Sequence, residues 1–510
     1  MMAKEGWRIL AIISLTIIML YLSPIAGEVS QASNVIQAEE IVKKVQAGQP
    51  VDYDNVSIAG YLNLSGLQNE IIVPFSIRNS TFLDAVNLEG AIFREIVNLR
   101  GSNFRGNVSF WNTRLLSESD FSGIKMDGDT DFRGAEFQNN ANFFNSSFLN
   151  ESSFEDSIFS KDVNFANTLF NDTGFENSRF EGNAIFMGSN FSGNTAFDFA
   201  RFFGLATFND VLFGRDASFT NTWFDGSAIF KGSNFMGNTS FAAARFAREV
   251  IFRSSIFYGN TTFGLAELSG FSDFADVDFH GLASFLVTRF SDNAHFVGAN
   301  FFKNFTLEGA RIYSMQLDNS SFSEDSKINL KDADFTRFVA RWNDIKDHLQ
   351  FDGAAYLALV KNYKNLEWFD DADAAYYEYR KISMEQRPVG WEKLIDIVAW
   401  LSSGFGVRVS YVAFWCIFTI ILFGLVFWIG NGMKHFEIIG LELPGNANIG
   451  DQHVSLTDAM YFSTAMFTTS QAPVNNYPIG FYRHLAMIEG ILGWFFLGLF
   501  VVVLSSLLIR

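Results

Sequence analysis

The side chains with the most evident chemistry lie in one short segment, where three hydroxyl groups and one primary amide follow one another. Oxygen atoms of this kind can line a pore that passes partly hydrated ions. An alternative is that these groups only cap the short helix before them. The candidate pore residues are Thr468, Thr469, Ser470, Gln471, Ala472 and Pro473.

Two apolar segments bracket the candidate pore residues. Residues 409–429 contain no charge and would span ~31 Å as a helix, which is the thickness of a bilayer core. Residues 485–509 form a second apolar segment that contains one acidic residue, Glu489. Residues 456–469 lie between them and are too short and too polar to span. A short helix and loop between two spans, here residues 456–478, predict a re-entrant loop inside a pore domain covering residues 407–510.

This part of the sequence resembles the two-helix pore module of potassium-channel-like proteins. The residues that carry the resemblance are Tyr461, Phe462, Ser463, Thr468, Thr469, Tyr477, Pro478, Glu489 and Gly493. The resemblance implies a homotetramer and permeating ions. It implies supporting roles for Tyr461, Phe462, Ser463 and Glu489.

Potassium filters continue with Val-Gly-Tyr-Gly, whereas this chain continues with Ser470, Gln471, Ala472 and Pro473. Proline fixes φ and removes the freedom that glycine gives such a filter, so potassium selectivity is not expected. Glu489 is expected to bond to the neighbouring loop, because intramembrane carboxylates are usually functional. An interfacial position near the helix end is the alternative.

A different pattern fills the middle of the chain. The sequence holds 60 phenylalanines, and phenylalanine or a substitute recurs in two interleaved series, each with a period of 11 residues. The residue two positions before each of them is nearly always small, as Ala184 is before Phe186. The spacing slips by one residue between Phe165 and Phe175. A square coil keeps every fifth and sixth residue inside, whereas an α-helix cannot.

Residues 71–335 resemble the pentapeptide repeat family, whose members form right-handed quadrilateral β-helices. The two 11-residue units predict coils of 22 residues. Some members of the family are acidic mimics of duplex DNA. The net charge of −18 argues against nucleic acid as a direct partner, and the apolar segments argue against a DNA mimic. The expected fold class is therefore mainly β, followed by a helical hairpin and the two-helix pore domain.

Helical patterns flank the repeats on both sides. Within residues 33–70, an amphipathic helix over 34–48 with an Asn34 N-cap is expected to cap the first coil, ahead of the entry strands. Residues 336–406 are expected to connect the repeats to the membrane. Helices over 342–363 and 370–384 would form a hairpin that caps the far end, and residues 391–405 would form an interfacial helix.

The remaining composition argues against an enzyme. The only cysteine, Cys416, lies inside an apolar segment, and the six histidines are scattered singly. No metal-ligand spacing, nucleophile elbow or phosphate-binding loop is present, so neither a metal nor a cofactor is expected.

The N-terminus predicts export, but the charges disagree about the side of the membrane. Residues 1–32 have the pattern of a signal peptide or N-terminal anchor, which would place the repeats outside the cytoplasm. The basic residues before the first span favour the cytoplasm instead: Arg380, Lys381, Arg387, Lys393 and Arg408. Large domains translocate largely regardless of charge, so an extracytoplasmic β-helix in a multi-pass cell-membrane protein is the preferred prediction. Asn-x-Ser/Thr sequons in the repeats, such as Asn238, fit either glycosylation or chance.

Two functions remain open from the sequence. The first is an oligomeric ion channel whose β-helix senses an extracytoplasmic ligand or envelope component, with membrane lipid around the two spans. The second is a membrane-anchored scaffold or adhesion protein that keeps a non-conducting remnant of a pore.

Overall fold

The computed structural model describes residues 34–67, 69–435, 453–473 and 476–508. The predicted signal segment, residues 1–32, lies outside the described residues. The chain forms a β-solenoid of about 14 turns, followed by helices that include two apolar candidate membrane helices. It divides into two compact units, Met1–Gly259 and Asn260–Arg510, which we describe in turn.

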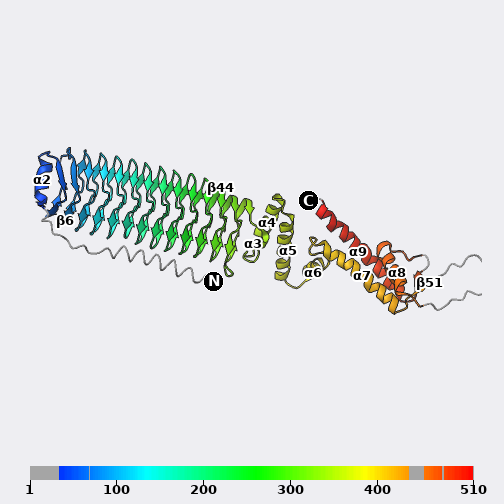
Figure 1. Cartoon of the computed structure of the whole chain (residues 1–510). Helices are drawn as coiled ribbons and strands as arrows, with labels where there is room; N and C mark the ends of the chain where they lie inside the picture. The colour runs from blue at the N-terminus through cyan, green and yellow to red at the C-terminus, as the bar shows by residue number, and fades with distance from the viewer. Residues whose placement is uncertain (1–33, 68, 436–452, 474–475, 509–510) are drawn as a thin grey trace, which may run out of the picture. The chain divides into compact units, whose positions relative to one another are not determined.

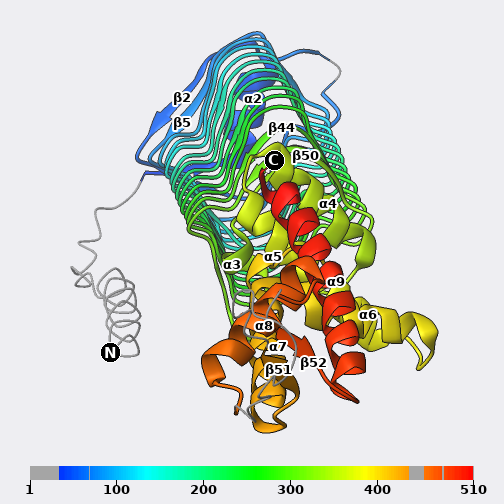
Figure 2. The same cartoon turned by 90° about the vertical axis from the view of Figure 1, so that its right-hand side faces the viewer.

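The first unit begins with a strand, not with the predicted helix. β1 (Val35–Gln37) pairs in parallel with β3 (Ser57–Ala59), and α2 (Ala38–Gln46) follows it directly. The predicted Asn34 N-cap is therefore wrong, because pairing with β3 holds the preceding residues extended. Ala38, Ile41 and Val45 of α2 are buried as expected. The helix lies against β2 (Val51–Asp54) and β4 (Leu62–Asn63), which are entry strands of the first turn (Figure 2).

Most turns of the first unit contain four strands of two residues each. One turn holds β6 (Thr81–Phe82), β7 (Val86–Asn87), β8 (Ile92–Phe93) and β9 (Val97–Asn98). The strands of the next turn pair with them in parallel, in sequence order: β10 (Asn103–Phe104), β11 (Val108–Ser109), β12 (Arg114–Leu115) and β13 (Ser119–Asp120). Figure 1 shows the stacked turns of this unit as rows of parallel arrows. The predicted four-sided coil is confirmed.

The register confirms the predicted coil length. Asn103 pairs with Thr81 and with Lys125, so successive turns are offset by 22 residues. The predicted slip is also present, because the Ser152 hydroxyl meets that of Thr173, 21 residues away. The shorter turn is accommodated at the corner between β22 (Leu169–Phe170) and β23 (Thr173–Gly174), where only Asn171 and Asp172 separate the strands.

Phenylalanine rings fill the interior and stack on the ring one turn away. The ring centroids of Phe175 and Phe197 lie 4.7 Å apart with planes inclined by 2°. Small residues such as Ala184 face inward beside them, as predicted. Some of the small residues carry a hydroxyl that donates to a main-chain carbonyl, as Thr222 Oγ1 does to Phe197 O at 2.8 Å. Others, such as Thr195 and Thr239, have a buried hydroxyl without a hydrogen-bond partner among the described residues. The core therefore consists of stacked apolar rings bordered by small residues, of which only a part have hydrogen-bonded hydroxyls.

A corner of the coil lies two residues after every second inward phenylalanine, for example after Phe219 and Phe230, and the residue at this corner has positive φ. Asn and Gly usually occupy it, as at Asn221 (φ 56°) and Gly232 (φ 71°). Glycine meets no steric penalty in this conformation and asparagine tolerates it, whereas β-branched residues do not. Leu265 and Val287 nevertheless adopt it, with φ of 62° and 55°.

The second unit contains longer strands before the solenoid ends. β44 (Arg289–His295), β47 (Arg311–Gln316) and β50 (Asp334–Val339) pair in parallel, in that order. Beyond them the chain covers the open strand edges. Residues 348–350 pair with Ile328, and the buried Asn362 amide bonds to both main-chain polar groups of Phe338, at 2.9 and 2.7 Å. Unpaired edges invite aggregation, so this cover protects the end of the solenoid.

The helices after the solenoid differ from the prediction at one place. The first predicted helix, over 342–363, is broken into α3 (Trp342–Ile345) and α4 (Gly353–Asn365), because Leu349 pairs with Ile328 between them. The side chain of Asp352 caps the start of α4 by accepting from Ala355 N. α5 (Phe369–Gln386) packs against α4 and forms the hairpin.

Candidate functional site

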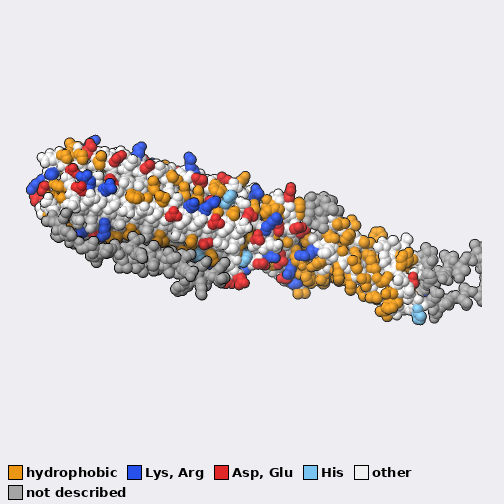
Figure 3. All heavy atoms as spheres, viewed as in Figure 1, with side chains coloured by type: hydrophobic (Ala, Val, Ile, Leu, Met, Phe, Trp, Pro, Cys, Tyr) orange, Lys and Arg blue, Asp and Glu red, His pale blue; other side chains and the backbone are white. Residues whose placement is uncertain are grey.

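Two apolar helices frame the candidate site. α7 (Val409–Ile429) and the Tyr482–Ser505 part of α9 (Tyr482–Leu508) are long and apolar enough to cross a membrane. Figure 3 shows apolar side chains gathered over this part of the surface. They include the exposed Phe414 and Ile417 of α7 and Trp494 of α9. Length and composition therefore make both helices candidate membrane helices.

A shorter helix, α8 (Leu456–Thr469), packs against both of them. Its start is fixed by Ser455, whose hydroxyl accepts from Asp458 N at 3.1 Å. The fully buried Phe462 meets Phe427 of α7 edge to face, with ring centroids 5.0 Å apart. Tyr461, its neighbour in sequence, is exposed.

The chain enters and leaves α8 at the same end of α7. Before α8, Val454 N donates to the Asn431 side chain at 3.0 Å. After it, β52 (Asn476–Pro478) pairs antiparallel with β51 (Met433–His435), and Ile479 N donates to Gly432 O at 2.9 Å. Both ends of the segment are thus held next to the residues that follow α7.

The candidate pore residues lie at the far end of α8 and just beyond it. The hydroxyls of Thr468 and Thr469 donate back to the carbonyls four residues earlier, each at 2.7 Å. Ser470 ends the helix with φ of 53°, and its hydroxyl lies 3.4 Å from Gly490 O of α9. Gln471 N donates to Thr469 Oγ1 at 3.3 Å. Gln471 and Ala472 are exposed and Pro473 is half-buried, so these side chains do not contribute to a packed core.

A buried polar contact joins α8 to α9. Glu489 is fully buried, and one of its carboxylate oxygens is in hydrogen-bond contact with the Ser463 hydroxyl. The same hydroxyl lies 2.7 Å from Ile420 O of α7, so Ser463 touches both apolar helices. The structure brings these predicted residues together, and Glu489 lies at the helix contact instead of at an exposed position.

Two glycines leave room for this packing, Gly493 for a main-chain carbonyl and Gly424 for a methionine side chain. A Cβ on Gly493 would lie 1.9 Å from Phe467 O, and one on Gly424 would lie 2.4 Å from Met460 Sδ. Gly493 was part of the sequence resemblance, whereas Gly424 was missed. A glycine inside an otherwise bulky apolar span is the signal that could have pointed to it.

The connection toward the solenoid has its own polar cluster. Asp396 of α6 (Trp391–Ser403) is nearly buried and pairs with Arg380 at 2.8 Å and with Arg387 at 2.9 Å. Beside them, Trp400 Nε1 donates to the Tyr377 hydroxyl at 2.9 Å. These contacts attach α6 to the end of α5. In the part of the chain that the structure describes, no group of three or more His, Cys, Asp or Glu side chains could hold a metal ion.

The comparison with known families supports the repeats and no other part. Residues 121–169 match a family model of pentapeptide repeats in nine copies. The solenoid is therefore built from pentapeptide repeats. No curated protein and no solved structure matches the chain.

Proposed function

We propose that this protein is an oligomeric membrane ion channel, or a channel-like protein, whose β-solenoid is a sensory or binding domain. The observation that carries the proposal is the course of the segment that contains α8. Val454 before α8 and Ile479 after it both bond to the residues just beyond α7. A segment that enters and leaves at one end, between two apolar helices, has the course of a re-entrant pore loop. Irregular backbone at membrane depth persists only where it is packed in protein or lines water.

The pore requires several copies of the chain. One copy supplies two candidate spans, and its candidate pore residues Gln471 and Ala472 remain exposed. A closed ring of copies would surround a central path and bring these residues together. The sequence resemblance to potassium-channel-like modules favours a homotetramer.

The channel is not expected to select potassium. The backbone after Thr469 contains Ser470 in a left-handed conformation and then Pro473, with no glycine between them. Carbonyl groups on successive residues cannot all point inward with proline in this segment. Hydroxyl and amide groups would instead line a wider path for partly hydrated ions.

The solenoid is proposed to lie outside the cytoplasm and to bind a ligand or envelope component. The test is simple because Cys416 is the single native cysteine, so one substitution removes every native thiol. In a Cys416→Ser background, Asn238→Cys in the solenoid should react with a membrane-impermeant maleimide on intact cells. Reaction only after the cells are opened would place the solenoid in the cytoplasm and overturn this orientation.

Conductance in a planar bilayer tests the channel itself. Purified full-length protein should conduct under an ion gradient, and Thr469→Ala or Gln471→Ala should change conductance or ion selectivity. Thr457→Ala is the matched control, because Thr457 lies exposed at the opposite end of α8. Absence of conductance under every ion gradient would refute the proposal.

A membrane-anchored scaffold or adhesion protein is the second candidate. The observation that favours it is Pro473, which follows closely after α8 and removes the backbone freedom that a ring of inward-facing carbonyls needs, so the segment fits a pore that no longer conducts. A scaffold would tolerate Thr469→Ala and Gln471→Ala without any change in its binding function.

A further inference from the structure

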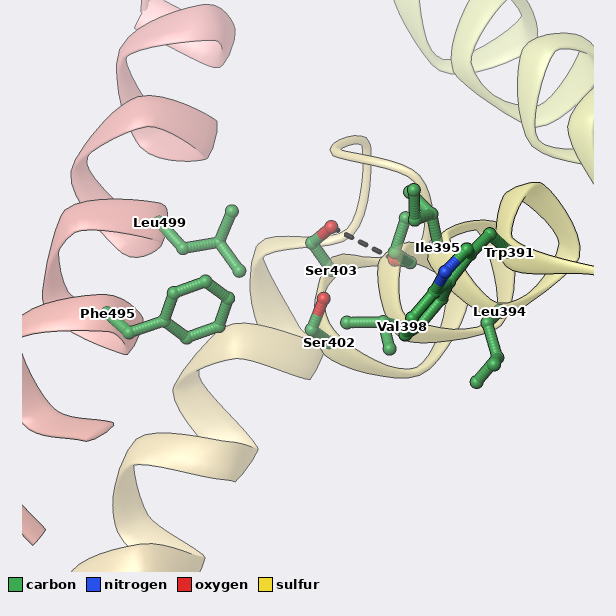
Figure 4. Close-up of a pocket in the computed structure, with 9 residues that line it drawn as sticks. Trp391, Leu394, Ile395, Val398, Ser402, Ser403, Phe495 and Leu499 are labelled. Carbon is green, nitrogen blue, oxygen red and sulfur yellow. Dashed lines mark hydrogen bonds between the residues drawn. The ribbon is translucent and has the colours of Figure 1, made fainter. Parts of the chain in front are cut away.

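A hollow lies between the interfacial helix α6 and the second half of α9. It encloses about 360 Å³, which is within the range of small-molecule sites. Figure 4 shows Val398 and Ser402 on one side of it and Phe495 and Leu499 on the other. Trp391, Leu394 and Ile395 of α6 extend the first of these walls.

The lining offers an occupant almost no polar contact. Its polar side-chain groups are the indole N–H of Trp391 and the hydroxyls of Ser402 and Ser403, and the Ser403 hydroxyl already donates to Ala399 O at 3.1 Å (Figure 4). A polar or charged ligand would lose its water in this hollow without gaining partners, which is costly. The chemistry of the site therefore selects an apolar occupant.

α6 is inverted relative to a helix on the surface of a water-soluble protein. Its carboxylate Asp396 is turned inward to two arginines, whereas Trp391 and Ile395 are 81% and 65% exposed. The other charged residues of α6, Glu392 and Lys393, lie in its first turn. A helix that buries the carboxylate in its middle and exposes its apolar side is suited to the hydrocarbon boundary of a membrane. The apolar side of α6 is continuous with the hollow, because Trp391, Ile395 and Val398 line it.

The hollow is also fixed to the start of the first candidate span. Trp415 Nε1 of α7 donates to Leu401 O of α6 at 2.7 Å. The opposite wall belongs to α9, the second candidate span. An occupant would therefore touch the interfacial helix and a span at once.

We propose that this hollow holds an acyl chain of a membrane lipid, wedged between α6 and α9. The inference rests on the proposed function to the extent that α7 and α9 must span a membrane. A lipid is favoured over a second copy of the chain because the walls continue directly into surfaces that hydrocarbon must cover.

The test uses full-length protein in phosphatidylcholine vesicles that contain a phosphatidylcholine with a diazirine in the middle of one chain. After irradiation, peptide mass spectrometry should find label on α6 and on Phe495 or Leu499 at least fivefold above Ile421, an exposed residue of α7. Val398→Trp and Leu499→Trp, which fill the hollow from its two walls, should each reduce that labelling at least fivefold. Ile421→Trp is the matched control and should leave it unchanged.

The outcomes separate this inference from the proposed function. Equal labelling of the hollow and of Ile421, in protein that resists carbonate extraction from the vesicles, would overturn the lipid site while leaving the spans intact. Loss of the protein on carbonate extraction would contradict the membrane-spanning helices themselves. The alternative occupant is a second copy of the chain, and native mass spectrometry of Val398→Trp tests it. If this variant loses the oligomer while its lipid labelling is unchanged, the hollow belongs to a second copy and the lipid site is overturned.

Discussion

Ser463 of α8 and Glu489 of α9 meet side chain to side chain in a place from which solvent is excluded. The second carboxylate oxygen of Glu489 is buried and has no hydrogen-bond partner among the described residues. The carboxyl group therefore depends on Ser463 for its side-chain contact. This dependence makes the pair the most testable feature of the candidate site.

Ser463→Ala should destabilise the protein by about 3 kcal/mol, because it leaves a buried carboxyl group without a partner. The double variant Ser463→Ala with Glu489→Leu should recover most of that loss, since both polar groups are then replaced. Thermal unfolding of the full chain in detergent measures the effect. If Ser463→Ala alone unfolds like the wild type, the contact does not support the helix pair.

The ladder of stacked rings should be sensitive to the loss of a single phenylalanine. Phe197 is fully buried and stacks on Phe175 and on Phe219, so Phe197→Ala should cost about 3–5 kcal/mol of unfolding free energy. The control is Phe203→Ala, because Phe203 is half-buried and lies below the guanidinium groups of Arg179 and Arg201. Equal losses in the two variants, measured by chemical denaturation, would contradict the assigned core.

Val287 should be a site where substitution stabilises the protein. It holds φ of 55° with its side chain half exposed, and a β-branched residue in this conformation is strained. Val287→Asn should raise the unfolding free energy by about 1 kcal/mol. The reciprocal change Asn221→Val, at a corner with φ of 56°, should lower it by a similar amount.

Leu286→Asn is the control for the strain argument, because Leu286 precedes Val287 in the same turn without a positive φ. It should shift the melting temperature little. Stabilisation by Leu286→Asn as large as by Val287→Asn would mean that the gain comes from replacing an exposed apolar side chain and not from relief of backbone strain.

The cover over the last turn should depend on one amide. Asn362→Leu keeps the number and branching of the side-chain heavy atoms but removes both bonds to Phe338, leaving a buried N–H and a buried carbonyl without partners. The expected cost is about 3 kcal/mol, and hydrogen exchange at residues 334–339 should rise. Asn365→Leu, at the end of the same helix, is the control. Unchanged exchange in Asn362→Leu would refute the cover.

The regular spacing of the phenylalanines made the solenoid predictable from the sequence. Contacts between residues that are distant in the sequence leave no such regular pattern and could not be predicted. The period of the phenylalanines determines coil length, because each ring must meet the ring one turn away. The slip after Phe165 was visible for the same reason. Asn34, in contrast, satisfies the local rule for a helix start, but pairing between β1 and β3 overrides that rule.

In the candidate site, too, the local sequence pattern was predictable and the contacts between distant residues were not. Glu489 could be singled out because a carboxyl group in an apolar segment is rare. Its partner could not be derived, because Ser463 lies 26 residues away on another helix. The break after Ile345 was missed because Leu349 has helical spacing in sequence but pairs with Ile328.

The pH dependence of stability should report on the hairpin at the end of the solenoid. Burial raises the pKa of Tyr356 from 10.0 to about 12, and it also raises the pKa of Tyr363. A raised pKa means that the folded hairpin keeps these protons while the unfolded chain loses them. The stabilisation is complete below the unfolded pKa of 10.0 and is lost as the pH rises toward 12.

Tyr356→Phe should remove part of this dependence, because phenylalanine keeps the ring contact with Trp342, 5.7 Å between centroids, and has no proton to lose. The melting temperature of the wild type should therefore fall more steeply than that of Tyr356→Phe between pH 10 and 12. Tyr313→Phe, at an exposed tyrosine of β47, controls for the general effect of alkali. Parallel curves for the wild type and Tyr356→Phe would show that the folded hairpin does not resist ionisation of Tyr356, so its burial could not be the cause of alkaline unfolding.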